Sequence, residues 1–337
     1  MGRNRSSQII GDSDENPRVL PRVAEPSQPV SGASRDIGWS GADRLTAMAD
    51  QASETSSTAA EERPYGGGSE GGPRRVRTRH FQNAKASGIK ITGLTSYDML
   101  SAQIFDEAGI DFLLVGDSAG NNVFGYDTTL PVRVDDLIPL TRAVAHAVRR
   151  AFVVADMPFG SYETDVQDAL HTAVRFMKET GAHAVKLEGG RRSAKQIRRI
   201  VDAGIPVMAH IGYTPQSEHQ LGGHIIQGRG ESGVEALLAD AHAVEEAGAF
   251  AVVLEMVPAD AAAQVTKELG IPTIGVGAGP HVDGQLLVWT DWAGFTTGRV
   301  PRFVRQYADL KGVLGGAARR YREDVEQGEY PGPEHSY

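Results

Sequence analysis

From about Ile89 onward, short continuous apolar runs alternate with longer amphipathic stretches. This alternation constrains the fold more than any other feature of the chain, because continuous apolar runs indicate strands buried on both faces, as in a parallel sheet. The predicted strands are 89–95, 111–117, 152–158, 184–189, 206–212, 250–256 and 272–279, with a less clear eighth strand at 286–291.

The stretches between the strands have helical periodicity, and several end in glycine, the usual residue just past a helix C-terminus. The predicted helices are 96–108, 135–150, 163–180, 191–203, 232–247 and 259–269, with a terminal helix at 303–327. Such units repeated over roughly 250 residues favour an α/β fold of the (β/α)8 TIM-type barrel class. A doubly wound open sheet is the alternative.

The first 73 residues have a different composition, rich in Ser, Gly, Pro and charged side chains, with scattered apolar residues. We interpret 1–73 as a disordered extension and 74–337 as the barrel catalytic domain. Met48 is a plausible start of a shorter chain. The basic stretch 74–80 is a solvated lead-in or a nucleic-acid arm; it lacks interleaved aromatic residues, and we expect no nucleic-acid partner.

Composition excludes several kinds of site. The chain has no cysteine, which rules out disulfides, thiolate chemistry and iron–sulfur clusters. Any metal must therefore be held by carboxylate, imidazole or backbone oxygen. The net charge of −9 gives no indication that the chain as a whole binds nucleic acid or an anionic membrane. Without an 18-residue apolar run or a signal peptide, no membrane helix is expected and the cytoplasm is the expected location.

Polar side chains lie within or just after successive predicted strands. These residues are Asp117, Ser118, Asp156, Lys186, Glu188, His210 and Glu255. In a parallel barrel the strand ends converge on one face, where active sites lie. Four acids there would repel one another and lose hydration unless a positive group lay among them, and oxygen ligands suit Mg²⁺ or a similar hard cation. A structural cluster neutralised by Arg or Lys is the alternative.

Other features of the sequence leave two interpretations open. Lys186 and Glu188 are two residues apart on one strand and therefore share a face. Lys186 is either a salt-bridge partner or a clamp for a substrate anion, and we favour the clamp. His210 is a core histidine or a substrate contact. The Gly-rich segment 216–230 is a candidate lid, and Gly275–Gly279 fits a tight turn better than a dinucleotide-binding loop.

Several long stretches match one enzyme family. They are LTSYD (94–98), VGDSAGN (115–121), GYDTTLPV (125–132), VADMPFGSY (154–162), AVKLEGG (184–190), MAHIGYTPQS (208–217), LGGHIIQGRG (221–230), VLEMVP (253–258), IGVGAGPHVDGQLLVW (274–289) and YPGPEHSY (330–337). From about residue 75 to the C-terminus the chain resembles ketopantoate hydroxymethyltransferase.

The resemblance implies a Mg²⁺-dependent transfer of a hydroxymethyl group from 5,10-methylenetetrahydrofolate to 3-methyl-2-oxobutanoate. The product is ketopantoate, a precursor in pantothenate and coenzyme A biosynthesis, and the family forms large homo-oligomers, usually decamers. The implied roles are Mg²⁺ binding by Asp117, Asp156 and Glu188; oxo-acid binding by Asp117, Ser118, Asp156 and Lys186; general base by Glu255; and a less defined pocket role for His210.

Small departures from the family pattern lie in the candidate lid. Residues 218–220 replace a more usual neutral stretch, and His224 stands where an aromatic residue is common. They put folate contacts or lid motion in doubt, and not the chemistry. Two alternatives remain: another 2-oxo acid lyase or mutase of the isocitrate lyase or phosphonomutase type, and a non-catalytic scaffold. The first uses a catalytic Cys or other signature absent here, and the second predicts lost site residues.

Overall fold

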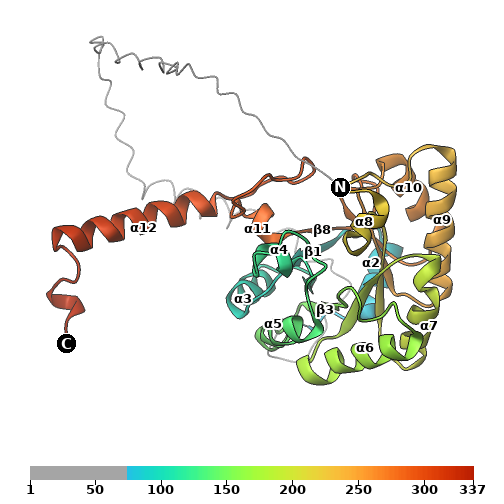
Figure 1. Cartoon of the computed structure of the whole chain (residues 1–337), viewed down its shortest axis with the longest axis horizontal. Coiled ribbons are helices and arrows are strands. Elements are labelled where there is room, and N and C mark those ends of the chain that lie inside the picture. Colours follow the sequence, from blue (N-terminus) through green and yellow to red (C-terminus); the bar gives the residue numbers. More distant parts are fainter. Residues whose placement is uncertain (1–73) are drawn as a thin grey trace, which may run out of the picture. The chain divides into compact units, whose positions relative to one another are not determined.

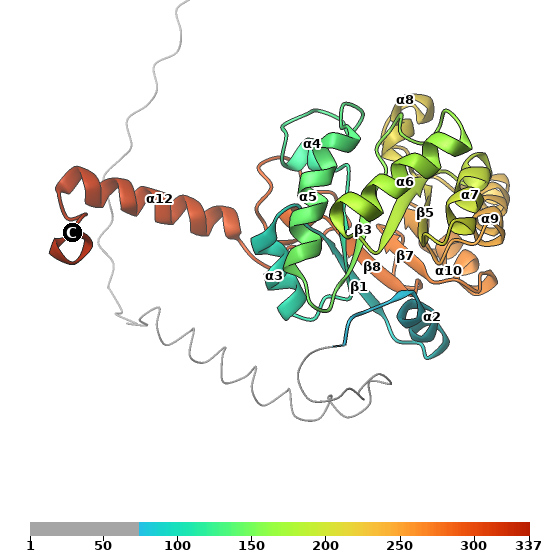
Figure 2. The same ribbon diagram turned by 90° about the horizontal axis from the view of Figure 1, so that it is seen from below.

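The structure is a computed structural model that describes residues 74–337. Eight parallel strands form a closed barrel in consecutive order (Figures 1 and 2). They are β1 Ile91–Thr95, β2 Phe112–Val115, β3 Phe152–Asp156, β4 Ala184–Glu188, β5 Val207–Gly212, β6 Ala251–Glu255, β7 Thr273–Val276 and β8 Gly284–Leu287. Because β8 pairs with β1, the barrel prediction is confirmed and the open sheet is excluded.

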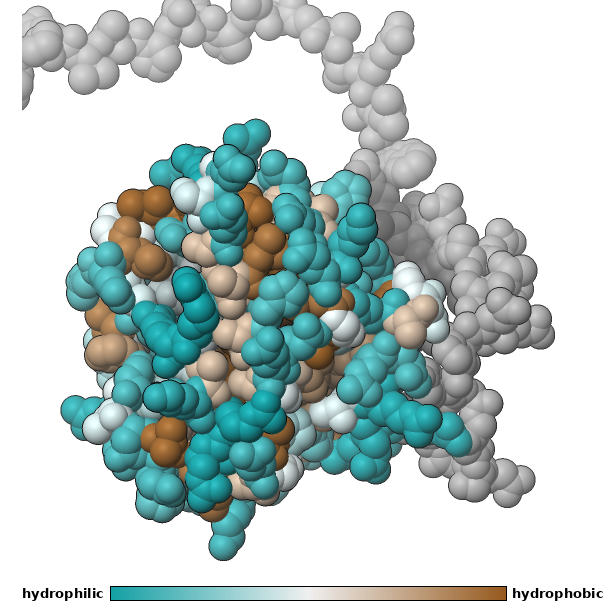
Figure 3. Space-filling view, turned by 90° about the vertical axis from the view of Figure 1, so that its right-hand side faces the viewer, coloured by the Kyte–Doolittle hydropathy of each residue, from teal (hydrophilic) through white to brown (hydrophobic). Residues whose placement is uncertain are grey.

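The described helices lie around the barrel, apart from the terminal helix α12, which extends away from it (Figure 2). They are α2 Thr78–Ala86, α3 Met99–Glu107, α4 Ala119–Asn122, α5 Val134–Ala147, α6 Val166–Thr180, α7 Ala194–Asp202, α8 Glu218–Leu221, α9 Gly230–Glu246, α10 Ala259–Glu268, α11 Trp289–Trp292 and α12 Leu310–Gln327. Their apolar faces pack on the strands, and the outer face on the side of α9 is mostly hydrophilic (Figure 3).

Local sequence signals set the ends of these helices. Asp98 begins α3 by accepting a hydrogen bond from the Ser101 backbone N–H, and Asp165 does the same for α6 with two N–H groups. Gly181 ends α6 in the left-handed conformation, which glycine adopts without steric cost. In α3 and α6, therefore, the polar cap fixes where the helix begins, and in α6 the glycine fixes where it ends.

The barrel interior is filled by side chains. Phe112 lies so close to Gly93 that a Cβ at position 93 would come within 2.2 Å of its ring, so glycine is needed there. Phe81 of α2 is fully buried and contacts the rings of Phe112, Phe152 and Phe250, with centroids 5.2–5.7 Å away. Helix α2 thereby closes the barrel at the end where the strands begin.

Two parts of the fold differ from the expectation. The eighth strand is Gly284–Leu287 and not 286–291, because Trp289 already starts the short helix α11. Helix α2 lies partly within the basic stretch 74–80, which we had interpreted as a lead-in; Val76 is buried at its start. The predicted disordered extension 1–73 and the possible start at Met48 lie outside the described residues.

Helix α12 extends away from the barrel (Figures 1 and 2) and has no buried side chain within this chain. It begins at Leu310, within the predicted terminal segment, where Asp309 accepts a hydrogen bond from the Gly312 N–H. Within 74–337, no helix combines the length and apolar character needed to cross a membrane.

Candidate active site

The register of the barrel brings the predicted site residues together. Asp156 on β3 pairs with Lys186 on β4, and Glu188 on β4 pairs with His210 on β5. Glu255 ends β6 opposite Gly212. Polar residues that are far apart in sequence therefore become neighbours at the carboxyl ends of the strands, where barrel enzymes have their active sites.

A buried ion pair lies at the centre of this cluster. Lys186 Nζ is 2.8 Å from Asp156 Oδ1, and both side chains are at most 4% exposed. The Asp117 backbone N–H donates to Asp156 Oδ2 at 3.1 Å. Burial raises the pKa of Asp156 to about 6 against the opposing effect of Lys186. Burial opposes protonation of Lys186, but the surrounding carboxylates outweigh it and hold the lysine pKa above its ordinary value.

Asp117 is also buried, and burial together with the charge of Glu188 raises the pKa of its carboxyl group. Its Oδ2 accepts a hydrogen bond from Gln216 Nε2 at 2.9 Å. The Gln216 backbone N–H donates to Glu188 Oε2 at 3.1 Å, and Tyr162 Oη donates to Gln216 Oε1 at 2.6 Å. Gln216 thus ties together carboxylates that follow β2 and end β4.

Gln216 and Tyr162 are not among the predicted site residues. Both lie in stretches that match the family, MAHIGYTPQS and VADMPFGSY, and both are polar residues just after a strand. That position was the available signal. Their importance depends on contacts among residues on or after four strands, which no single stretch of sequence displays.

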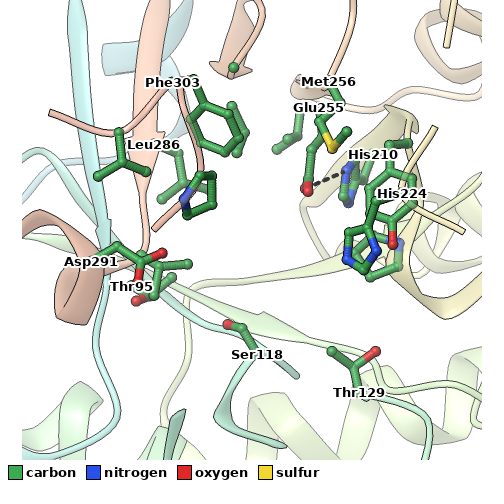
Figure 4. Close-up of a pocket in the computed structure, with 18 of the residues that line it drawn as sticks. Thr95, Ser118, Thr129, His210, His224, Glu255, Met256, Leu286, Asp291 and Phe303 are labelled. Carbon is green, nitrogen blue, oxygen red and sulfur yellow. Dashed lines mark ion pairs between the residues drawn. The ribbon is translucent and has the colours of Figure 1, made fainter. Parts of the chain in front are cut away.

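His210 lies between two carboxylates. Its Nδ1 is 3.4 Å from Glu188 Oε1, and its Nε2 is 3.4 Å from Glu255 Oε2 (Figure 4). Burial and Lys186 oppose protonation, but the two glutamates outweigh them and raise the His210 pKa to about 9. Near neutral pH the ring is therefore an imidazolium, and it holds Glu255, whose side chain is 20% exposed, toward the cavity.

The remaining predicted site residue is Ser118, which follows β2. Its hydroxyl lies 2.8 Å from that of Tyr97, and both oxygens can donate or accept. Burial raises the pKa of Tyr97 to about 12, so the phenol keeps its proton. Ser118 lines the same cavity as the other six predicted residues.

The candidate lid borders this cavity. His224 stacks on Tyr213 with ring centroids 5.2 Å apart, and its Nδ1 lies 3.6 Å from Glu218 Oε1. Two of the residues that depart from the family pattern, Glu218 and His224, therefore contact each other at the cavity wall. The glycine run after β7 forms a turn, with Gly277 and Gly279 at positive φ, as the tight-turn interpretation predicts.

The carboxylates are chemically suited to a hard cation but do not form a closed cage. Among residues 74–337, no group of three His, Asp or Glu side chains is arranged to hold a metal ion as it stands. Glu188 Oε1 is buried and makes no hydrogen bond within residues 74–337, although His210 Nδ1 lies 3.4 Å from it. Carboxylate oxygens gathered in this way are the donors that a hard divalent cation prefers.

Comparison with known proteins identifies the family. The family model described as ketopantoate hydroxymethyltransferase matches residues 75–333. The 3-methyl-2-oxobutanoate hydroxymethyltransferase of Leifsonia xyli subsp. xyli is 79% identical over 265 residues, covering 79% of this chain and 95% of that protein. The enzyme of the same name from Saccharopolyspora erythraea is 63% identical over 264 residues, covering 78% and 90%.

Solved structures support the fold alone. Phosphonopyruvate hydrolase, solved with oxalate and Mg²⁺, superposes with a TM-score of 0.51 at 14% sequence identity, covering 77% of this chain and 93% of that one. At that identity the likeness is evidence for the barrel and not for the reaction. The family model and the two relatives decide the assignment: this chain belongs to the ketopantoate hydroxymethyltransferase family.

Proposed function

We propose that this protein transfers a hydroxymethyl group from 5,10-methylenetetrahydrofolate to 3-methyl-2-oxobutanoate and releases ketopantoate and tetrahydrofolate. The high identity to enzymes of that name supports the reaction, and family membership implies a metal-dependent hydroxymethyltransferase. The observation that carries the proposal is the placement of Glu255, held by His210, beside the buried cluster around Lys186.

We assign the metal to Asp117, Asp156 and Glu188, with Mg²⁺ as the expected ion. The support is the oxygen-only donor set and its burial. When bound, a divalent cation withdraws electrons from the keto and carboxylate oxygens of a 2-oxo acid and so acidifies the hydrogen on C3. The protein residues supply the remaining functions.

Lys186 is the proposed clamp for the substrate carboxylate, and Ser118 is a second polar contact. Lys186 is ion-paired with Asp156, so substrate binding would share a charge that the enzyme already holds in place. A lysine fixed in a buried pair gives up little conformational entropy when it binds an anion. Lys186 can therefore act both as the salt-bridge partner of Asp156 and as the clamp for the substrate carboxylate.

Glu255 is the proposed general base. Its carboxylate takes the C3 proton, which leaves an enolate, and C3 then forms a bond to the one-carbon unit of the folate. One water molecule supplies the hydroxyl group, and tetrahydrofolate leaves. His210, a positioning residue in this scheme, directs Glu255 into the cavity through the contact at 3.4 Å.

Exchange of the C3 hydrogen of 3-methyl-2-oxobutanoate in D₂O, followed by NMR with and without Mg²⁺ and without folate, tests the first half of the reaction. We expect metal-dependent exchange that is lost in Glu255→Gln. If the folded, metal-loaded protein shows no exchange even after folate is added, the proposed substrate or base is wrong.

We also expect a homo-oligomer in the cytoplasm, with a decamer as the form known for the family. Helix α12 supports association, because apolar side chains along it are exposed in the single chain, among them Val313, Leu314, Tyr321 and Val325. Sedimentation of the purified protein would give the number of subunits.

A further inference from the structure

The cavity is larger than a five-carbon oxo acid requires. Its volume is about 1450 Å³, whereas pockets for drug-sized ligands span roughly 300–1,000 Å³. The carboxylate cluster and Lys186 account for one part of its lining, and the rest is available to a second, larger ligand. The inference below rests on the proposed function, in which that ligand is a reduced folate.

Three arginines line this cavity from two separate segments. Arg229 immediately precedes α9, while Arg299 and Arg302 lie in the connection between α11 and α12. All three are exposed, and none makes an ion pair or side-chain hydrogen bond within 74–337. Arg150 and Arg175, by contrast, contact acidic side chains at 2.6–2.8 Å. Uncommitted guanidinium groups that converge on one cavity indicate an anionic ligand.

An apolar wall lies beside these arginines. Phe303, next to Arg302, packs on the turn after β7 so closely that a Cβ at Gly277 would come within 2.7 Å of its ring. Figure 4 shows Phe303 and Leu286 facing the cavity across from His224, with Met256 beside Glu255. A ligand that matches both features has a flat aromatic body and several carboxylates at one end.

We propose that Arg229, Arg299 and Arg302 bind the γ-linked glutamate tail of the folate donor, so that the enzyme selects polyglutamylated over monoglutamylated folate. Each added glutamate brings one more carboxylate, and guanidinium groups pair with carboxylates through two parallel hydrogen bonds. Three uncommitted guanidinium groups can pair with several carboxylates at once, which suits a chain of carboxylates better than a single one.

The test compares KM for the monoglutamate and the triglutamate of 5,10-methylenetetrahydrofolate. Because exposed ion pairs are individually weak, we expect the triglutamate KM to be lower by about three- to tenfold. The ratio should shrink as salt rises from roughly 0.05 to 0.5 M, because salt screens exposed charges. The double variant Arg299→Gln/Arg302→Gln should bring the ratio close to one, and Arg229→Gln should reduce it from the other segment.

Arg305→Gln is the matched control, because Arg305 follows the same segment, stacks over Tyr307 at 5.0 Å and does not line the cavity. It should leave the ratio unchanged. Equal KM values in the wild type, or a ratio retained in the double variant, would overturn the inference. Folate-free exchange of the C3 proton separates the two levels: exchange without glutamate selectivity refutes only the tail site, whereas no exchange and no product with either folate refutes the proposed function as well.

Discussion

Phe81 anchors α2 at the end of the barrel opposite the candidate active site, and replacing it with alanine tests that arrangement. The Phe81 ring is fully buried and contacts three other phenylalanine rings. Only Phe81 and Ala84 of α2 are buried, and Phe81 is by far the larger of the two, although Lys85 also ties the helix to Asp283 at 2.8 Å. The substitution therefore removes a large part of the contact between α2 and the barrel.

The expected loss of stability is about 4 kcal/mol. Truncation of a buried phenylalanine to alanine costs about 3–5 kcal/mol, including the cavity that it leaves. Each lost aromatic contact contributes about 0.5–1.5 kcal/mol beyond the buried area, which places the cost in the upper part of that range. Phe81→Leu keeps most of the apolar volume and should cost only about 1–2 kcal/mol.

The assay is urea unfolding followed by circular dichroism, with kcat measured in parallel on the folded variants. We expect kcat to stay within about twofold of the wild type, because Phe81 contacts residues at the starts of the strands, whereas the candidate site lies at their ends. A stability loss below about 1.5 kcal/mol for Phe81→Ala would refute the view that α2 closes the barrel through this ring.

Three further substitutions test the site and the fold. Glu255→Gln should lower kcat by about 10²–10⁴-fold while the KM for the oxo acid changes little, and an unchanged kcat would remove Glu255 as the base. Lys186→Met should lower the free energy of unfolding by about 3–5 kcal/mol at pH 8, measured with urea, because it leaves Asp156 buried without its partner. The loss should be smaller at pH 5, where Asp156 can take up a proton. An equal loss at both pH values would contradict this reasoning. Burial, together with Arg75 and Arg77, lowers the pKa of the half-buried His183 to about 4, and its Nδ1 accepts a hydrogen bond from the Val153 N–H. Because the unfolded chain then binds more protons below pH 6.5 than the folded chain does, stability is lost as pH falls from 6.5 toward 4. His183→Asn, which retains an acceptor, should reduce that acid-induced loss by about 2 kcal/mol after allowance for solvent screening, and identical pH profiles would show that this ring does not control it.

The barrel was predictable because its strands are continuous apolar runs, and such runs require burial on both faces. The same reasoning placed the eighth strand too late, because Gly284–Leu287 is short and the apolar residues continue into α11. It missed α2 because most residues of that helix are polar and only two of them, Phe81 and Ala84, are buried, which is too few to produce a clear apolar periodicity. Local sequence patterns identify an element well when it belongs to the repeated strand and helix units of the barrel, and poorly when, like α2, it lies outside that repeat.

The site residues were identifiable by type and position, but their partnerships were not. That Asp156 faces Lys186, and Glu188 faces His210, follows from the barrel register, which the sequence does not display. The role of Gln216 depends on the hydrogen bond that its amide, located after β5, donates to Asp117 after β2. The sequence likewise does not predict the three arginines at the cavity, because their lack of partners among residues 74–337 is a property of the folded chain.

The charges at the strand ends give a physical argument for the proposed cation. Asp117, Asp156, Glu188 and Glu255 face only two positive groups, Lys186 and His210, so full ionisation leaves two negative charges in a largely buried site. Burial and the neighbouring negative charges raise the pKa values of Asp117 and Asp156, which shows where the excess lies. A divalent cation has the charge that offsets it. The two cationic side chains are already engaged by carboxylates, so neither can neutralise the remainder. The electrostatics of the chain's own residues therefore support a divalent ion at Asp117 and Asp156, independently of any likeness to other proteins.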